Sequence, residues 1–279
     1  MMKNRGFTLV ELVIVIVITG ILAATLTVFL KPTIDSYFDT RRRADLMDMA
    51  DTALRRMSQD IRRAVPNSIR WVSAGCFQLV PTIAGGRYRM ESDTVSATAS
   101  KWVDSAALTT DFDVLSPMAS IPVAGAANGD WVVIDNQNGD EVYTDPSPGP
   151  RARITAFSTA STAAQKLVYQ HRITVSKQFP PGYDGGRFVI VPNAEQTVFY
   201  NRVGTTLYRT VDVFGAVQAT SCAKTTGAVV ATNVQNFTVV YSSNQGATQQ
   251  SGFVWMRLEL GDPLESVALA YGVHVDNVP

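Results

Sequence analysis

The feature that most constrains this 279-residue chain is a long apolar run close to its N-terminus. From Phe7 to Leu30 every residue is apolar or small, apart from the single acid Glu11. A helix of this length measures roughly 36 Å, against a bilayer hydrocarbon core of about 30 Å. Because the run has no polar stripe of helical period, it fits lipid contact better than a half-buried globular helix. We therefore predict a transmembrane helix over residues 7–30.

Glu11 helps to distinguish between the kinds of N-terminal segment that this apolar run could be. A secretory signal has an apolar core of about 7 to 15 residues followed by a small-residue cleavage site. This run is longer, and Ala23 and Ala24 lie inside it. A plain membrane anchor fits the length but leaves Glu11 unexplained. A carboxylate in the middle of a bilayer costs about 2.5 to 3.5 kcal/mol, so Glu11 needs a partner or a shallow position.

The residues around Glu11 suggest what that partner is. A short basic leader, residues 1–6, precedes the sequence FTLVEL, and the region from Arg5 to Leu12 resembles the cleavage region of type IV prepilins and type II secretion pseudopilins. The resemblance implies that a prepilin peptidase cuts after Gly6 and methylates the new amino terminus at Phe7. The freed amine has an ordinary pKa near 8 and is cationic at neutral pH. Glu11 is then the assembly residue, which pairs with the amine of a neighbouring subunit in the filament.

Beyond the apolar run the pattern becomes amphipathic. Pro32 can kink or interrupt a helix, but apolar residues then recur at spacings of three and four, until Pro66 and Asn67 end the pattern. The recurring residues are Met47, Ala50, Leu54, Met57, Ile61 and Ala64. We expect residues 31–65 to continue the helix and to lay one face on a β-rich head formed by residues 66–279. This α+β arrangement is that expected of the type IV pilin fold.

The head is expected to consist of short strands divided by turns. Two hairpins are predicted, one with Asn138-Gly139 between residues 131–134 and 142–143, and one at Val203-Gly204. The stretches 92–110, 145–150 and 156–165 are predicted to be loops. The predicted strands are residues 77–80, 131–134, 167–175, 187–191, 197–201, 206–211, 236–241 and 253–260.

A second resemblance covers residues 186–241 and the helix end at residues 54–70. The sequences between Gly186 and Tyr241, and the segment from Leu54 to Arg70, are similar to the larger minor pilins, to the J-type minor pseudopilins and above all to the MSHA pilus biogenesis minor pilins of the MshO family. This implies a subunit held in the bacterial inner membrane with its head in the periplasm, and later at the pilus or cell surface. The implied place in the filament is its tip or a priming complex. The implied partners are prepilin peptidase, other pilins, the inner-membrane assembly platform and membrane lipid.

The two cysteines are too few for a disulfide scaffold and lack the spacing of a zinc site. In a head outside the cytoplasm Cys76 and Cys222 can oxidise, and we predict that they pair. Two separate buried thiols are the alternative. Some relatives carry a cysteine where this chain has Asn201, so their disulfide pattern cannot be transferred.

Charge and composition argue against several other functions. The chain has 24 basic and 24 acidic residues, which gives no sign of a nucleic-acid partner. His171 and His274 lie in strand-like segments without a catalytic motif, so we predict no catalytic residue, cofactor or metal. Residues 135–141 are acidic but do not follow the EF-hand spacing, and a hairpin turn accounts for them without calcium.

Three alternatives to a minor pilin remain open at this stage. The first is a minor pseudopilin of a type II secretion system, which shares every feature above. The second is an envelope enzyme on a signal anchor, which the missing catalytic motif disfavours. The third is a surface adhesin whose loops around Trp102, Trp131 or Tyr183 bind a ligand.

Overall fold

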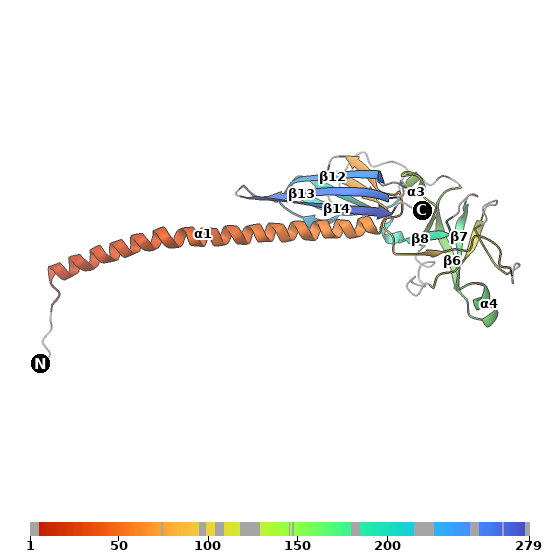
Figure 1. The fold of residues 1–279 in the computed structure, drawn as a ribbon, viewed down its shortest axis with the longest axis horizontal. Coiled ribbons are helices and arrows are strands. Elements are labelled where there is room, and N and C mark those ends of the chain that lie inside the picture. Colours follow the sequence, from red (N-terminus) through yellow and green to blue (C-terminus); the bar gives the residue numbers. More distant parts are fainter. Residues whose placement is uncertain are drawn as a thin grey trace. The chain divides into compact units, whose positions relative to one another are not determined.

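The computed structural model describes most of the chain, and contacts divide it into two compact units, residues 1–48 and 49–279. One helix, α1 (Leu9–Arg62), begins in the first unit and ends in the second (Figure 1). It continues through Pro32 and ends at Arg62, shortly before the predicted end at residue 65. The described residues are 6–73, 75–94, 99–103, 109–117, 129–144, 146, 148–179, 185–214, 226–245, 251–263 and 265–276.

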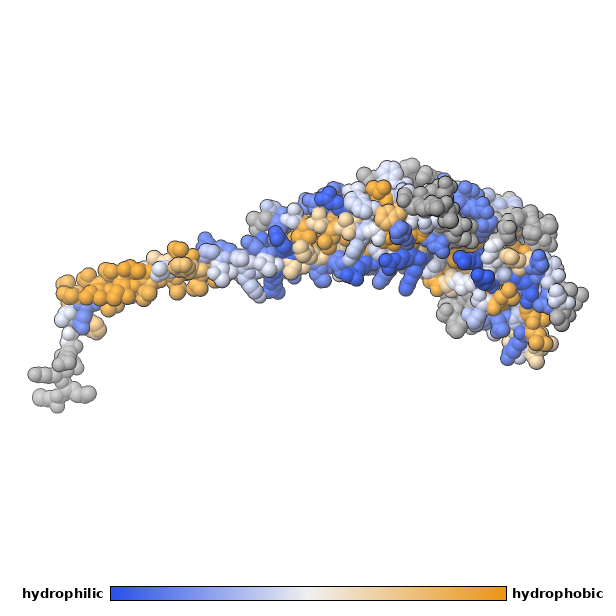
Figure 2. All heavy atoms as spheres, viewed as in Figure 1, coloured by the Kyte–Doolittle hydropathy of each residue, from blue (hydrophilic) through white to orange (hydrophobic). Residues whose placement is uncertain are grey.

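In the first unit, α1 exposes its apolar side chains on all sides. Every large apolar side chain between Phe7 and Leu30 is at least half exposed, and Figure 2 shows a continuous apolar surface over this part of the helix. The hydroxyl groups of Thr25 and Thr27 donate to the carbonyls of Ile21 and Ala23, at 2.5 and 2.9 Å. These polar groups are thus satisfied within the helix, which is what an apolar surrounding requires.

In the second unit, the C-terminal part of α1 packs on two antiparallel sheets, and together they form what we call the scaffold. The sheets have the strand orders β1-β2-β9-β10-β11 and β12-β13-β14. Four residues of the predicted helical stripe, Ala50, Leu54, Met57 and Ile61, are completely buried, whereas Met47 is 44% exposed and Ala64 is half-buried. The scaffold strands are β1 (Arg70–Ser73), β2 (Cys76–Leu79), β9 (Thr197–Val203), β10 (Thr206–Asp212), β11 (Ala228–Ala231), β12 (Val234–Gln245), β13 (Ser251–Gly261) and β14 (Ser266–Asp276).

A polar cluster fastens α1 to the five-stranded sheet. Asp60 of the helix accepts hydrogen bonds from the hydroxyl of Tyr200 at 2.7 Å and from Nε of Arg209 at 2.8 Å. Arg209 also donates to both carboxylate oxygens of Glu195, at 3.2 and 3.1 Å. Burial, reinforced by the Asp60 carboxylate, raises the pKa of Tyr200. The tyrosine therefore stays a neutral donor, and the helix is held in register on the sheet.

The remaining strands form a six-stranded sheet of order β3-β8-β5-β6-β7-β4 that closes on itself. Beyond the end of β3, the amide of Arg89 donates to the carbonyl of Asp113 and the amide of Leu115 donates to the carbonyl of Arg87, both at 2.9 Å. These bonds join the first and last strands, so we call residues 84–191 the barrel. Its elements are β3 (Ala84–Arg87), β4 (Thr109–Val114), β5 (Trp131–Ile134), α3 (Glu141–Thr144), β6 (Arg151–Thr159), α4 (Ala163–Val168), β7 (His171–Phe179) and β8 (Arg187–Val191).

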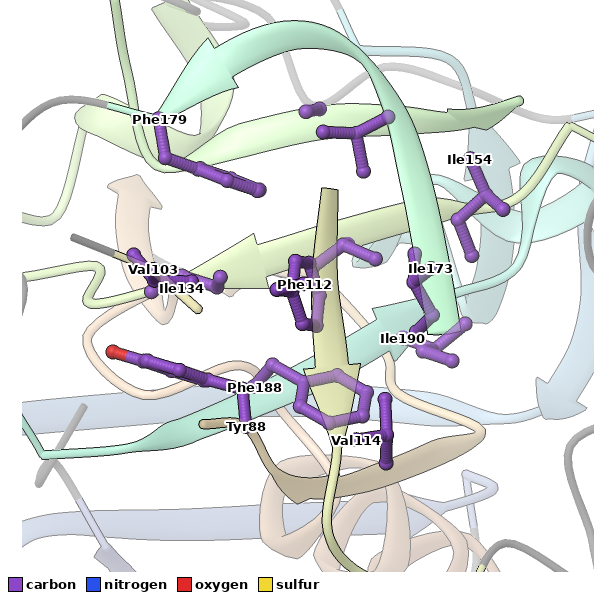
Figure 3. Close-up of a cluster of buried hydrophobic side chains, with 13 residues drawn as sticks. Tyr88, Val103, Phe112, Val114, Ile134, Ile154, Ile173, Phe179, Phe188 and Ile190 are labelled. Carbon is purple, nitrogen blue, oxygen red and sulfur yellow. The ribbon is translucent and has the colours of Figure 1, made fainter. Parts of the chain in front are cut away.

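The barrel has a hydrophobic core of its own. Figure 3 shows aromatic and β-branched side chains from its strands converging on Phe112. The ring of Phe112 lies edge-on to the rings of Tyr88, Phe179 and Phe188, with centroids 5.6 to 6.3 Å apart, a geometry that aromatic pairs favour. The fully buried members of this core show that the described strands of the barrel close around packed side chains.

The barrel is an insertion between two neighbouring strands of the scaffold. β2 and β9 pair directly, with Cys76 opposite Asn201 and Leu79 opposite Val198. The whole barrel and the short 3-10 helix η1 (Asn193–Glu195) lie between these strands in sequence. The chain therefore leaves the scaffold sheet and returns to it at the same place.

The predicted hairpin at Asn138-Gly139 is wrong. β5 ends at Ile134 as expected, but the following residues form the short helix α3 and not a second strand. Asn136 is buried and holds this segment against the chain that follows α1, because its side-chain amide donates to the carbonyl of Pro66 at 2.7 Å. A turn dipeptide is compatible with either structure, and here tertiary hydrogen bonds decide between them.

Further contacts join α3 and the residue before it to residues 68–70, at the start of β1. The hydroxyl of Tyr143 donates to the carbonyl of Ser68 at 2.6 Å, and Arg70 pairs with Asp140 at 2.6 Å while lying over the Tyr143 ring. Burial raises the pKa of Tyr143, so it remains a hydrogen-bond donor. The segment predicted to be a surface turn thus connects the barrel to the scaffold.

Two further predictions need correction, and several are confirmed. Residues 156–165 are not a loop, because β6 continues to Thr159 and α4 follows. The strand predicted over residues 167–175 begins only at His171, since α4 extends to Val168. β5 and β8 occupy the predicted residues, and the β9–β10 hairpin turns at Gly204, whose φ of 61° is readily adopted only by glycine.

Candidate processing and assembly site

The N-terminus of α1 is closed by a reciprocal capping box. Thr8 is the N-cap residue, and its hydroxyl oxygen accepts a hydrogen bond from the amide of Glu11 at 3.3 Å. In return, Oε2 of Glu11 accepts from the amide and the hydroxyl of Thr8, each at 3.2 Å. This is the Thr-x-x-Glu arrangement that satisfies otherwise unpaired helix donors. The Thr-x-x-Glu spacing is visible in the sequence, although Thr8 was not among the predicted site residues.

Glu11 therefore has a local role as well as the assembly role predicted for it. Both hydrogen bonds that the Glu11 carboxylate accepts use Oε2, and Oε1 has no hydrogen-bond partner among the described residues. A carboxylate offers about four acceptor positions, two on each oxygen, so capping leaves Oε1 available. Its negative charge is also favoured at a helix N-terminus, where the helix dipole is positive. The carboxylate is thus held in a fixed position at an exposed helix end, with one oxygen open to a cation.

Gly6 and Phe7 lie just outside the helix and are exposed. A Cβ added to Gly6 would meet no described atom within 4 Å, and the backbone there does not adopt a positive φ. Packing among the described residues therefore gives no reason for a glycine at position 6. Phe7 is 81% exposed. The Gly6–Phe7 peptide bond is accordingly exposed, as the predicted cleavage site would need to be.

The predicted disulfide can be followed at one end only. Cys76 lies in β2 and is buried. Cys222, the other cysteine of the chain, lies outside the described residues. The pairing of Cys76 with Cys222 stays a prediction.

The two histidines lie in different sheets. His171 of β7 contacts the Thr159 hydroxyl at 3.1 Å and stacks on Phe157, and burial lowers its pKa. His274 of β14 lies beside Phe253, with ring centroids 5.1 Å apart. Neither contact supplies the base, acid and nucleophile that a catalytic site needs.

Most of the acidic segment 135–141 is engaged in protein contacts. Asp140 pairs with Arg70, Glu141 accepts from Asn138, and Asp135 accepts from Gln137. Within the ranges that the structure describes, no group of three or more His, Cys, Asp or Glu side chains is arranged to hold a metal ion.

Of the three aromatic residues considered for ligand binding, Trp131 is placed in β5 and packs on Phe214 at 5.5 Å, with the Arg151 guanidinium 4.8 Å from its ring. Trp131 therefore belongs to a strand of the head and not to a loop. Trp102 is partly exposed, and Tyr183 lies outside the described residues.

Comparison with known proteins addresses the N-terminal segment. Residues 1–27 match the prokaryotic N-terminal methylation motif. The match includes Gly6, Phe7 and Glu11, and it indicates a prepilin-like substrate of the type IV pilin and pseudopilin kind. Such a substrate is processed by prepilin peptidase and assembles with other pilins. Neither the curated proteins nor the solved structures contain a match to the chain.

The helix α1, which begins within the motif, agrees with this assignment. Within the described residues, α1 is long and apolar enough to cross a membrane, and the window that meets this criterion is not buried. An N-terminal apolar helix of this kind is consistent with membrane anchoring. The chain therefore combines a processing motif, an apolar helix and a β-rich C-terminal part, an α+β organisation that fits a pilin-like subunit.

Proposed function

We propose that the chain is a minor pilin of a type IV, MSHA-like pilus. It is cut between Gly6 and Phe7, methylated at Phe7, and held in the inner membrane by residues 7–30 with its head in the periplasm. The observation that carries this proposal is the coincidence of the motif in residues 1–27 with the capped helix end at Glu11 and the exposed apolar surface of α1.

The capping geometry suggests how assembly proceeds. Cleavage after Gly6 leaves an ammonium group on Phe7, and Glu11 presents Oε1 at the same end of the helix. Pairing of this oxygen with the ammonium of a neighbouring subunit compensates two charges that are each costly in an apolar surrounding. Since the apolar side chains of α1 have no partner in their own unit, lipid surrounds them first and other pilin helices afterwards.

The inserted barrel supports a minor and not a repeating position. A pilin scaffold of α1 and its sheets is complete without residues 84–191, because β2 and β9 pair directly. The barrel adds bulk to one side of each subunit, and bulk that cannot be repeated along a filament favours the tip or a priming complex. Its immediate neighbours are then other minor pilins and, during assembly, the inner-membrane platform.

The test is the N-terminus of the natural protein, read by mass spectrometry of the membrane and filament fractions. We expect a chain that begins at Phe7 and carries one methyl group on its α-amine, in both fractions. A protein that begins at its initiator methionine, or one trimmed beyond Ala24, would refute the proposal.

A minor pseudopilin of the J type is the nearest alternative, because the motif, the helix and the head suit it equally well. The two predict different locations for the mature chain. A pilus subunit is recovered in sheared surface filaments, whereas a pseudopilin remains in the cell envelope.

A surface adhesin is a candidate of another class, and the barrel is the observation that favours it. The barrel has its own core and carries partly exposed Trp102 on one of its connections. Binding of the full-length protein to a glycan array, lost on Trp102→Ala, would support an adhesive role. Equal binding by the wild type and the variant would show that Trp102 has no role in adhesion.

A further inference from the structure

The strand β14 has an open edge. In the described part of the chain it pairs only with β13 and forms the border of its sheet (Figure 1). The amide of Gly261 in β13 donates to the carbonyl of Asn233, the residue before β12. Backbone groups alternate in direction along a strand, so Leu260 points to β14 and bonds with Val267, its register partner. The backbone groups that point to the open edge are then those of Ala268, Ala270, Gly272 and His274.

Edge strands in soluble proteins are usually protected by charge, proline, bulges or short length. β14 is 11 residues long, contains no lysine, arginine or proline, and carries a single charged residue, the terminal Asp276. Its register with β13 is free of bulges from end to end. A long and regular edge of this kind is suited to pairing with another strand.

A groove runs along this edge between β14 and α1. Tyr271 and Gly272 form one wall, and one face of the helix forms the other with Arg55, Gln59 and Arg62, around a cavity of about 250 Å³. The hydroxyl of Tyr271 donates to Asp51 of α1, which fixes the two walls relative to each other. Backbone donors and acceptors on one side thus face polar and basic side chains on the other.

A second cavity extends the groove toward the barrel. It also measures about 250 Å³, shares Arg62 with the first, and has a mixed lining whose apolar part includes Val65, Phe188 and Val275. Asp276 lies at its wall on the β14 side. An extended segment that follows β14 therefore passes Arg62 and then reaches the apolar part of this lining.

The charges along the groove select the kind of segment. Arg55 is paired with Asp51 at 2.6 Å. Arg62 is exposed and has no ion-pair partner among the described residues. Beyond Arg62, the second cavity is lined by Arg187 together with Asp135 and Asp276, so it offers no excess of positive charge to an acid. An acidic side chain is therefore favoured at Arg62 and an apolar one beyond it.

We propose that the open edge of β14 is a docking site for an extended strand of a neighbouring filament subunit. That strand bonds to the backbone of Ala268, Ala270 and Gly272, places an acidic side chain on Arg62, and inserts an apolar side chain beside Phe188. Main-chain pairing of this kind gives affinity, while the alternate side chains give specificity. The inference rests on the proposed function, since it takes the neighbour from the same filament.

The experiment compares cysteine labelling in free and assembled protein. Ala270→Cys and Val240→Cys place a thiol on the same outer face of the three-stranded sheet, at the open edge and two strands away, about 12 Å apart. Both positions are exposed. Each full-length variant is treated with polyethylene-glycol maleimide in detergent and in sheared filaments. The unsubstituted protein gives the background from the native cysteines.

We expect labelling at residue 270 to slow at least tenfold on assembly, with residue 240 within twofold of its free rate. Unchanged labelling at both positions overturns the edge proposal. Equal protection of both positions also overturns it, because the neighbouring subunit would then cover the outer face of the sheet and not its edge. If the chain is absent from filaments, the proposed function fails and the edge proposal fails with it. Presence in filaments without protection of residue 270 refutes the edge proposal alone.

A second pair of variants tests the charge. Arg62→Glu reverses the residue shared by the two cavities, whereas Arg63→Glu makes the same change at an exposed residue that lines neither. We expect Arg62→Glu to reduce recovery in filaments at least fivefold, with unchanged membrane level and melting temperature. Equal recovery of the two variants contradicts the role of Arg62 in docking.

Discussion

The two roles of Glu11 can be separated by three substitutions at one helix end. Thr8→Ala removes the N-cap hydroxyl but keeps the carboxylate. Glu11→Gln keeps a side-chain oxygen that can accept from the Thr8 amide, as glutamine does in capping boxes, but removes the charge. Glu11→Ala removes both. The cap and the charge thus change independently of each other.

The structure sets the expected sizes of these effects. Loss of the Thr8 cap costs about 1 kcal/mol, which is roughly a fivefold change in the population of the ordered helix end. Loss of the Glu11 charge leaves the neighbour's ammonium unpaired in an apolar surrounding, at about 2.5 to 3.5 kcal/mol, or roughly 70- to 400-fold in assembly. Thr8→Ala should therefore assemble at a moderately reduced level, while both Glu11 variants should be almost absent from filaments.

The assay is the ratio of each variant in sheared filaments to that in membranes, measured by quantitative immunoblot, with the mature N-terminus checked by mass spectrometry. All three variants should be cleaved after Gly6. Filament levels of Glu11→Gln equal to wild type would show that capping and not charge is required. The pairing of Glu11 with the Phe7 ammonium would then be refuted.

Three more predictions concern processing, stability and oxidation. Gly6→Ala should leave the uncleaved precursor in the membrane, visible as a larger intact mass, and a normal mature mass would contradict the assignment of the cleavage residue. Asp60→Ala removes the acceptor shared by the helix–sheet cluster and leaves Arg209 without one of its partners. It should destabilise the protein by about 2 to 3 kcal/mol, with a melting temperature lower by roughly 4 to 12 °C in a thermal scan. Alkylation without reductant should find no free thiol if Cys76 and Cys222 pair, whereas two modified thiols would disprove the pairing.

The N-terminal methylation motif could be recognised from the sequence because its residues lie close together in the chain. Gly6, Phe7 and Glu11 form one continuous motif, and the apolar run follows it at once. The stripe from Ala50 to Ile61 was also predictable, since helical periodicity indicates which face is buried. The capping role of Thr8 depended on an equally local signal and was within reach of the same reasoning.

The barrel could not be predicted in this way. Several of its strands were found from their composition, but the pairing of Ala84 with Ile190 joins residues more than 100 positions apart. No local pattern specifies such a partner. The hairpin error at Asn138-Gly139 has the same origin, because the buried side chain of Asn136 is satisfied by Pro66, which belongs to another part of the chain.

The adjacency of β2 and β9 has a practical consequence. Leu79 and Val198 are direct partners across two strands, so a few linking residues could span the gap that the barrel now fills. The barrel could then be exchanged for another folded module, or omitted, without changing the order of the flanking strands. A filament subunit built in this way can acquire a new surface specificity while its processing motif and assembly helix stay the same.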